Sequence, residues 1–139
     1  MSRWEAIVTS QPPITQQVTF IYTRDLATAS AFLRDKVGLQ LALNQNDLCH
    51  IYTVAPNAFL GVCVNREPPA EPGVTYSFVT PDVDSMYETL KARGVEFEAP
   101  PTLSERFNVY SCFFRGIESY RFEIQAFRNA DWPAPLTAS

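Results

Sequence analysis

The amino-acid sequence predicts an α+β fold in which two βαβββ modules follow one another, their curved mixed β-sheets forming an open cup with the helices outside. One observation is a repeat: residues 24–41 (RDLATASAFLRDKVGLQL) resemble residues 81–98 (PDVDSMYETLKARGVEFE) at a separation of about 57 residues. A second is the shared order of strand, aspartate, helix and glycine in each copy. A third is a proline-rich segment between the copies. Two copies are too few for a solenoid, so a fused duplication is expected.

The chain length fits one domain. Its 139 residues are 46% hydrophobic and include 18 aromatic side chains (10 Phe, 6 Tyr and 2 Trp). A chain of this size buries roughly two-thirds of its surface on folding, which is enough for a core without disulfides or metals. We therefore expect a single domain over residues 1–139. Its expected parts are module one at 17–64, a linker at 65–73, module two at 74–127, and tails at 1–16 and 128–139.

Module one begins with VTFIYT at 18–23, a strand rich in β-branched and aromatic residues. Asp25 follows and is suited to cap a helix. The helix keeps apolar residues at helical spacing and stops at Gly38, because glycine adopts the left-handed backbone that ends a helix. The apolar positions are Leu26, Ala29, Leu33 and Val37. Further strands are expected at about 39–44, 48–54 and 58–64.

Module two repeats this order. VTYSFVT at 74–80 is its first strand, Asp82 its helix cap and Gly94 its helix end. Apolar spacing at Val83, Met86 and Leu90 indicates the helix face that enters the core. Further strands are expected at about 95–98, 108–114 and 120–127.

The linker NREPPAEPG carries three prolines, one glycine and several charges, which is typical of a connection between structural units. Both tails also contain prolines and one tryptophan each, Trp4 and Trp132. A large aromatic side chain is unusual in a tail that packs on nothing. The tails therefore either fray or lie over a neighbouring subunit, and the second alternative agrees with an expected homodimer.

Charge and composition exclude several classes of partner. Eleven basic and 15 acidic residues give a net charge of -4, and no basic stripe is present, so nucleic acid is not expected as a partner. The chain has no run of about 18 apolar residues and no long apolar segment near its start, so we expect no membrane association and a cytoplasmic location. Cys49, Cys63 and Cys112 lack metal-binding spacing and are expected to be reduced, buried thiols.

Three segments carry a resemblance to a known family: VTFIYTRDLATASAFLRDKVGLQL, VTYSFVTPDVDSMYETLKARGVEF and YRFEIQAF. Together with the linker they resemble the vicinal oxygen chelate superfamily over about residues 17–127. That superfamily contains glyoxalases, bleomycin-resistance proteins and extradiol dioxygenases. The resemblance implies that two modules curl their sheets into a cup, and that a metal at its floor chelates vicinal oxygens of the substrate. It specifies the fold more sharply than the function, because one fold serves many chemistries.

The family's metal ligands are mostly missing from this chain. The resemblance implies ligands on the first and last strands of each module, at Val18, Gly61, Thr75 and Glu123, and only Glu123 has a ligand-type side chain. A shift of register would offer Gln17 instead, but strand alternation turns it to the opposite face from Val18. One histidine cannot supply a site with two histidines and a carboxylate. We therefore expect no cofactor, with a divalent metal (Fe, Mn, Ni or Zn) as the less favoured alternative.

Strand alternation predicts which side chains face the cup. The inward set is Val18, Phe20, Tyr22, Phe59, Gly61, Cys63, Thr75, Ser77, Val79, Arg121, Glu123 and Gln125. Aromatic groups beside a few polar ones are typical of a site for an aromatic or amphipathic small molecule. The candidate ligand-binding residues are Phe20, Tyr22, Phe59, Thr75, Ser77 and Arg121.

Two residues are candidates for catalysis. Glu123 would act as a general base from a partly apolar cup, or it forms an ion pair with Arg121 or another arginine, or it is a remnant of a lost metal site. His50 would be its acid–base partner or a proton shuttle. The alternative for His50 is a half-buried strand histidine bonded to the backbone.

Three functions remain open from the sequence. The first is a dimeric, metal-free protein that binds a small organic molecule, as the bleomycin-resistance branch does. The second is an enzyme, either a lyase or isomerase with Glu123 as base, or a dioxygenase-type enzyme with Glu123 as a residual metal ligand. The third is a ligand-sensing or partner-binding domain. The sequence leaves open whether the protein is an enzyme.

Overall fold

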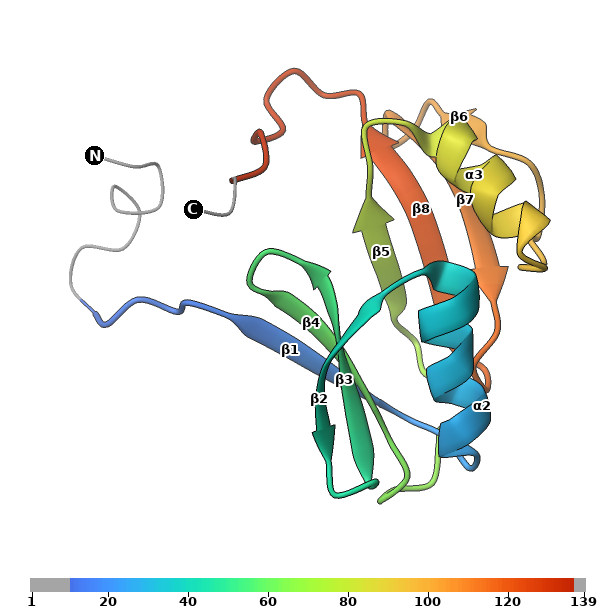
Figure 1. Ribbon diagram of the computed structural model, residues 1–139. Coiled ribbons are helices and arrows are strands. Elements are labelled where there is room, and N and C mark those ends of the chain that lie inside the picture. The colour runs from blue at the N-terminus through green and yellow to red at the C-terminus, as the bar shows by residue number, and fades with distance from the viewer. Residues whose placement is uncertain (1–10, 137–139) are drawn as a thin grey trace.

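The computed structural model describes residues 11–136 and contains two four-stranded mixed sheets with a helix on each (Figure 1). Module one consists of β1 (Gln17–Tyr22), α2 (Leu26–Ala31), η1 (Phe32–Val37), β2 (Gln40–Gln45), β3 (Cys49–Ala55) and β4 (Ala58–Cys63). Module two consists of β5 (Thr75–Val79), α3 (Val83–Ala92), β6 (Thr102–Ser104), β7 (Val109–Arg115) and β8 (Arg121–Phe127). The predicted α+β fold of two βαβββ modules is confirmed. No helix among the described residues is long and apolar enough to cross a membrane.

Each helix begins after its predicted aspartate cap and ends before its predicted glycine. The carboxylate of Asp25 accepts a hydrogen bond from Thr28 N at 3.1 Å, and that of Asp82 accepts one from Ser85 N at 3.0 Å. Gly38 and Gly94 follow the helices with φ of 86° and 94°. These are left-handed conformations that cost glycine little, so both helices end there.

The first helix differs from the regular α-helix that its apolar spacing predicts. Its second half, η1, is a π-helix, and Leu39 N bonds to Leu33 O at 2.9 Å where the helix closes. Leu33 and Val37 remain buried on the same side. The wider turn therefore keeps the apolar face on the core although the backbone spacing has changed.

The two sheets have equivalent strand orders, β1-β4-β3-β2 and β5-β8-β7-β6. The first and last strands of each module are parallel neighbours, with Phe20 opposite Gly61 in one sheet and Ser77 opposite Glu123 in the other. The other neighbours are antiparallel. The duplication is therefore visible at the level of individual residue pairs.

One predicted strand is wrong. Residues 95–98 do not form the expected second strand of module two, and only Phe97 makes an isolated bridge to Phe114. The edge strand is β6, which pairs with β7 after Pro100 and Pro101. Proline has no backbone N–H to donate to a ladder, so the strand begins only after the pair.

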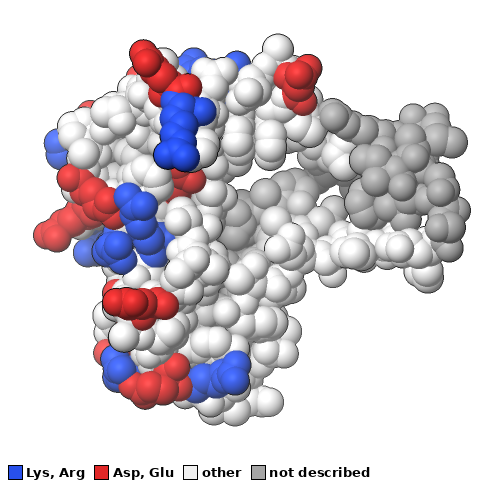
Figure 2. All heavy atoms as spheres, turned by 180° about the vertical axis from the view of Figure 1, so that it is seen from behind, with Lys and Arg blue, Asp and Glu red and all other residues white. Residues whose placement is uncertain are grey.

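The core lies on the helix-facing side of both sheets. On β1, Ile21 is fully buried whereas its neighbour Phe20 is 43% exposed, as strand alternation requires. Phe32 of the first module approaches Phe114 of the second, with ring centroids 6.2 Å apart. The two modules therefore share one hydrophobic core. In Figure 2 the charged side chains gather over the helix side of the molecule, and the described surface away from the helices shows few of them.

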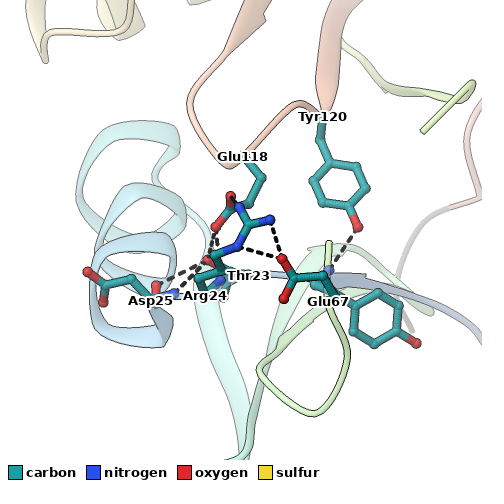
Figure 3. Close-up of polar contacts among 7 residues, drawn as sticks. Thr23, Arg24, Asp25, Glu67, Glu118 and Tyr120 are labelled. Carbon is teal, nitrogen blue, oxygen red and sulfur yellow. Dashed lines mark hydrogen bonds and ion pairs between the residues drawn. The ribbon is translucent and has the colours of Figure 1, made fainter. Parts of the chain in front are cut away.

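Polar contacts join the modules at the turn before β8 (Figure 3). Glu118 Oε2 accepts hydrogen bonds from Thr23 Oγ1 and Arg24 N, both at 2.9 Å, and the hydroxyl of Tyr120 accepts one from Tyr22 N at 3.0 Å. Glu118 has a φ of 48°, so a non-glycine residue takes the left-handed position of this turn. We refer to the contacts of Glu118 and Tyr120 with residues 22–24 as the module latch.

The cysteines depart from the prediction of three reduced thiols. Cys49 on β3 and Cys63 on β4 lie directly opposite each other and are joined by a disulfide. Antiparallel pairing of β3 with β4 brings them together, with a one-residue register shift between Thr53 and Ala55. Cys112 is free and buried, and burial together with the charge of Glu123 raises its thiol pKa to about 11. Cys112 is therefore a poor nucleophile near neutral pH.

Candidate functional site

The side of sheet one that faces away from the helices has an aromatic surface. Phe20 and Tyr22 project from β1, and Gly61 lies beside Phe20 on β4. A side-chain carbon added to Gly61 would lie only 2.6 Å from Phe20 Cδ1. Glycine at this position therefore lets the Phe20 ring lie flat over the sheet. We refer to this side of sheet one as the aromatic face.

A cavity of about 420 Å³ opens at one end of the aromatic face. Phe20 and Tyr22 form its aromatic wall, and its polar lining consists of Gln45, Asn46 and Asn65. The amides can both donate and accept hydrogen bonds, so the cavity offers ring surface next to adaptable polar groups. Such a combination suits an aromatic or amphipathic organic molecule.

Phe59 and Tyr22 are placed differently. Both pack against the small buried cluster of Cys49, Ile51 and Cys63, but only Tyr22 also lines the cavity. The guanidinium of Arg66 lies 5.6 Å from the centre of the Tyr22 ring, within reach of a cation–π contact. A cation therefore stands near the aromatic wall, next to the uncharged lining.

The corresponding side of sheet two carries a polar chain centred on Glu123. Gln125 Nε2 donates hydrogen bonds to Ser77 Oγ and, at 3.1 Å, to Glu123 Oε1. Glu123 is only 9% exposed, and within residues 11–136 no Lys or Arg forms an ion pair with it. The buried carboxylate is therefore oriented by an amide and not neutralised by a cation.

Arg121 is held by another acidic residue. Its guanidinium makes two hydrogen bonds to Glu98, at 2.9 and 2.8 Å, and lies 3.8 Å from the centre of the Phe113 ring. Arg115 approaches the same carboxylate at 3.7 Å. The hydrogen bonds from Arg121 are the main cause that holds the pKa of Glu98 below its usual value. Thr75, the cross-strand neighbour of Arg121, is exposed.

His50 lies on the other side of sheet one, against α2. Its Nδ1 is 2.7 Å from Ser30 Oγ, and Ser30 in turn contacts the hydroxyl of the buried Tyr52. His50 Nε2 is buried without a hydrogen-bond partner among the described residues. The structure therefore does not bring His50 together with Glu123. Its partner is a serine side chain, where the sequence suggested the backbone.

The residues at the family's metal positions do not fit a metal ion. Val18 and Gly61 have no donor atom, Thr75 offers only a hydroxyl, and one oxygen of Glu123 already accepts from Gln125. Within residues 11–136 no three His, Cys, Asp or Glu side chains come together as a metal would require. The expectation of a metal-free protein stays a prediction.

The fold and the open sheet faces define a class of protein built from paired βαβββ modules. A family model described as Glyoxalase/Bleomycin resistance protein/Dioxygenase superfamily matches residues 15–124, so the chain belongs to this superfamily. The resemblance drawn from the repeated segments is thereby confirmed. None of the curated proteins matches the chain.

Solved structures of the superfamily superpose well. A glyoxalase/bleomycin resistance protein/dioxygenase from Nocardioides has a TM-score of 0.70 at 22% identity, over 96% of this chain and 95% of that one. Lactoylglutathione lyase from Agrobacterium tumefaciens has a TM-score of 0.67 at 21% identity, over 83% and 95%. A superfamily member from Sphaerobacter thermophilus DSM 20745 has a TM-score of 0.63 at 21% identity, over 80% and 95%. At such identities the likeness shows the fold and no shared activity.

Several site residues were missed from the sequence. Gln45, Asn46 and Asn65 lie in loops or at strand ends, where strand alternation makes no statement. Glu98 was missed because residues 95–98 were expected to form a strand. Phe113 was missed because the expected strand at 108–114 was not assigned a face, although Phe113 lies opposite Glu123. Counting outward from the β3–β4 turn, where Ala55 pairs with Ala58, would have placed Cys49 opposite Val64. The pairing with Cys63 depends on a one-residue register shift between Thr53 and Ala55, which the sequence pattern does not reveal.

Proposed function

We propose that this protein binds an aromatic or amphipathic small organic molecule on its open sheet faces without a metal, in the manner of a bleomycin-resistance-like protein. The observation that carries the proposal is the cavity on the aromatic face, where Phe20 and Tyr22 adjoin three side-chain amides. Phe20 is 43% exposed although it is a large apolar side chain. Contact with a ligand ring would cover it, and removal of apolar surface from water is the main source of binding free energy for such molecules.

A thermal-shift screen tests this proposal. The panel contains basic, neutral and acidic aromatic compounds of similar size, and we expect compounds from at least one group to raise the melting temperature. Phe20→Ala should weaken binding of those compounds by tenfold or more, since it removes the aromatic wall. Phe107→Ala is the matched control, because Phe107 is also exposed, at 65%, but does not line the cavity. No shift with any group, or equal losses in the two variants, would contradict the proposal.

We further propose that the protein is a cytoplasmic homodimer. Exposed apolar side chains occur on both sheets, including Leu43 at 51% and Val79 at 54%. Apolar side chains left open to water favour association with another copy that would cover them. Light scattering after size-exclusion chromatography should give twice the chain mass of 15.7 kDa, whereas a monomer mass at micromolar concentration would contradict the dimer.

A second candidate function is a lyase or isomerase in which Glu123 acts as general base. Its support is the buried carboxylate that no described cation neutralises, held at a fixed orientation by Gln125. Such a base abstracts a proton next to a carbonyl group. Carbonyl compounds that stabilise the protein would be incubated with it in heavy water and checked for deuterium uptake by mass spectrometry. Uptake that Glu123→Gln abolishes supports catalysis, and absence of uptake supports binding alone.

A dioxygenase-type enzyme with Glu123 as residual ligand is the remaining alternative. Elemental mass spectrometry on protein purified without a histidine tag separates it from the metal-free proposal. We expect iron, manganese, nickel and zinc each to be far below one per chain, because three of the four family positions lack a carboxylate, imidazole or thiolate. A stoichiometric metal would overturn the metal-free proposal and favour the metalloenzyme.

A further inference from the structure

The disulfide between Cys49 and Cys63 lies in the wall of the cavity. The two residues face each other across β3 and β4 with their Cα atoms 4.1 Å apart, and both line the cavity beside Phe20 and Tyr22. Each residue is only 5% exposed, so the cavity is the side from which a reagent reaches the sulfurs. A structural crosslink that only fastened a hairpin would have no need of this location.

We propose that Cys49 and Cys63 form a reversible thiol–disulfide site that exchanges with low-molecular-weight thiols and disulfides entering the cavity. The two cysteines are separated by only 14 positions in the sequence and lie on strands that a hydrogen-bonded ladder already holds together. Because β3 and β4 pair without it, the bond can open while the fold persists. In a reducing compartment, such as the cytoplasm proposed above, protein disulfides are typically transient and take part in exchange or sensing.

The oxidation has two exchange steps. One cysteine gives up its proton and attacks a sulfur of the small disulfide, whose S–S bond breaks; a mixed disulfide forms, and one small thiol leaves with a proton. The second cysteine then gives up its proton and attacks the sulfur of the first. The mixed disulfide breaks, the Cys49–Cys63 bond forms and the second small thiol leaves. The protein loses two electrons and two protons, and the small disulfide gains both.

The third cysteine acts as an internal reference. Cys112 is 2% exposed on β7 of the other sheet, and burial raises its thiol pKa to about 11. It therefore has little thiolate near neutral pH and does not take part in exchange in the folded protein. Exchange is thus confined to the pair. For the ligand proposed above, opening the bond alters the wall it contacts. This consequence and the argument from a reducing compartment rest on the proposals above, whereas the exchange itself rests on the geometry of the pair.

The test uses the full chain and no ligand, so its outcome is independent of the proposed function. Folded protein is equilibrated in buffers that range from excess reduced to excess oxidised glutathione, then quenched in acid, denatured and alkylated with N-ethylmaleimide. Mass spectrometry should show three labels per chain in the reducing buffers and one label, on Cys112, in the oxidising buffers. Returning oxidised protein to the reducing buffer should restore three labels.

Three cysteine variants sharpen the result. Cys63→Ser should trap one glutathione on Cys49 in oxidising buffer, and Cys49→Ser serves in its place if the first variant fails to fold. Cys112→Ser should carry two labels per chain in reducing buffer and none in oxidising buffer. This change should occur at the same glutathione ratio at which the parent protein changes from three labels to one. The proposal is overturned by three labels at every ratio, by one label at every ratio, or by glutathione on Cys112 in the folded protein.

Discussion

Gly116 shows how a single missing side chain can matter to the whole core. A Cβ atom at this position would lie 2.0 Å from Phe32 Cζ, and Phe32 is a buried ring that also approaches Phe114. Gly116→Ala forces that ring out of its place in a packed interior, which typically costs about 1–3 kcal/mol. We expect a loss of this size in the free energy of unfolding measured with urea.

Gly61→Ala is the matched comparison for Gly116→Ala. Its added Cβ would also be too close to a ring, at 2.6 Å from Phe20 Cδ1, but Phe20 is 43% exposed and can swing outward. We therefore expect about 0.5 kcal/mol or less of destabilisation at this site. Equal losses in the two variants would show that the Phe32 contact is not what makes Gly116 necessary.

At the scale of single elements, the helix caps are directly testable. Asp82→Ala removes the acceptor of the hydrogen bond from Ser85 N at the start of α3 and should cost about 1 kcal/mol in unfolding free energy. Asp82→Asn retains an acceptor oxygen and should remain close to the parent protein. Urea unfolding of both variants checks the prediction. A loss as large in the asparagine variant would mean that the cap acts through its charge.

The elements also show where sequence patterns suffice. Both helices were predictable because their start and end signals act locally. An aspartate side chain caps each start, and a glycine with positive φ follows each end, at Asp25, Asp82, Gly38 and Gly94. The structure of residues 95–98 was not predictable in this way. Their alternating apolar side chains pack against the core, but their backbone does not pair with a neighbouring strand apart from one isolated bridge. Val95 N bonds back to Leu90 O at 3.0 Å as part of the helix end. An alternating pattern is therefore insufficient for a strand when a helix end precedes it and prolines follow.

At the scale of the whole molecule, the duplication was visible in sequence, and the contact between the modules was not. The repeat follows from similar local patterns, which a single sequence contains in full. The contact between Thr23 and Glu118 joins residues 95 positions apart, and the Phe32–Phe114 contact likewise has no local pattern. The same limit applies to the candidate site. Strand alternation predicted the aromatic face, but the amides of the cavity come from loops and strand ends.

The module latch makes the joint between the modules dependent on pH. Hydrogen bonds from Arg24 N and Thr23 Oγ1 hold the pKa of Glu118 below its ordinary value of 4.5. A carboxylate whose pKa is lowered on folding contributes stability above its unfolded pKa and loses it as the pH falls toward the folded pKa. Glu118→Gln should therefore lower the free energy of unfolding by about 1–2 kcal/mol at pH 7. The difference in unfolding free energy between the variant and the parent protein should become smaller below about pH 4.5.

Unfolding free energies measured with urea at pH 7 and pH 3.5 check this prediction. Glu67→Gln is the matched control, because Glu67 also pairs with Arg24 but is 72% exposed and has no hydrogen bond to Thr23. An exposed pair contributes little, so this variant should stay near the parent protein at both pH values. If Glu118→Gln lowers the unfolding free energy equally at both pH values, the module latch depends on the shape of the side chain and not on its charge. A difference that becomes smaller in acid shows that the negative charge of Glu118 holds the second module against the end of β1.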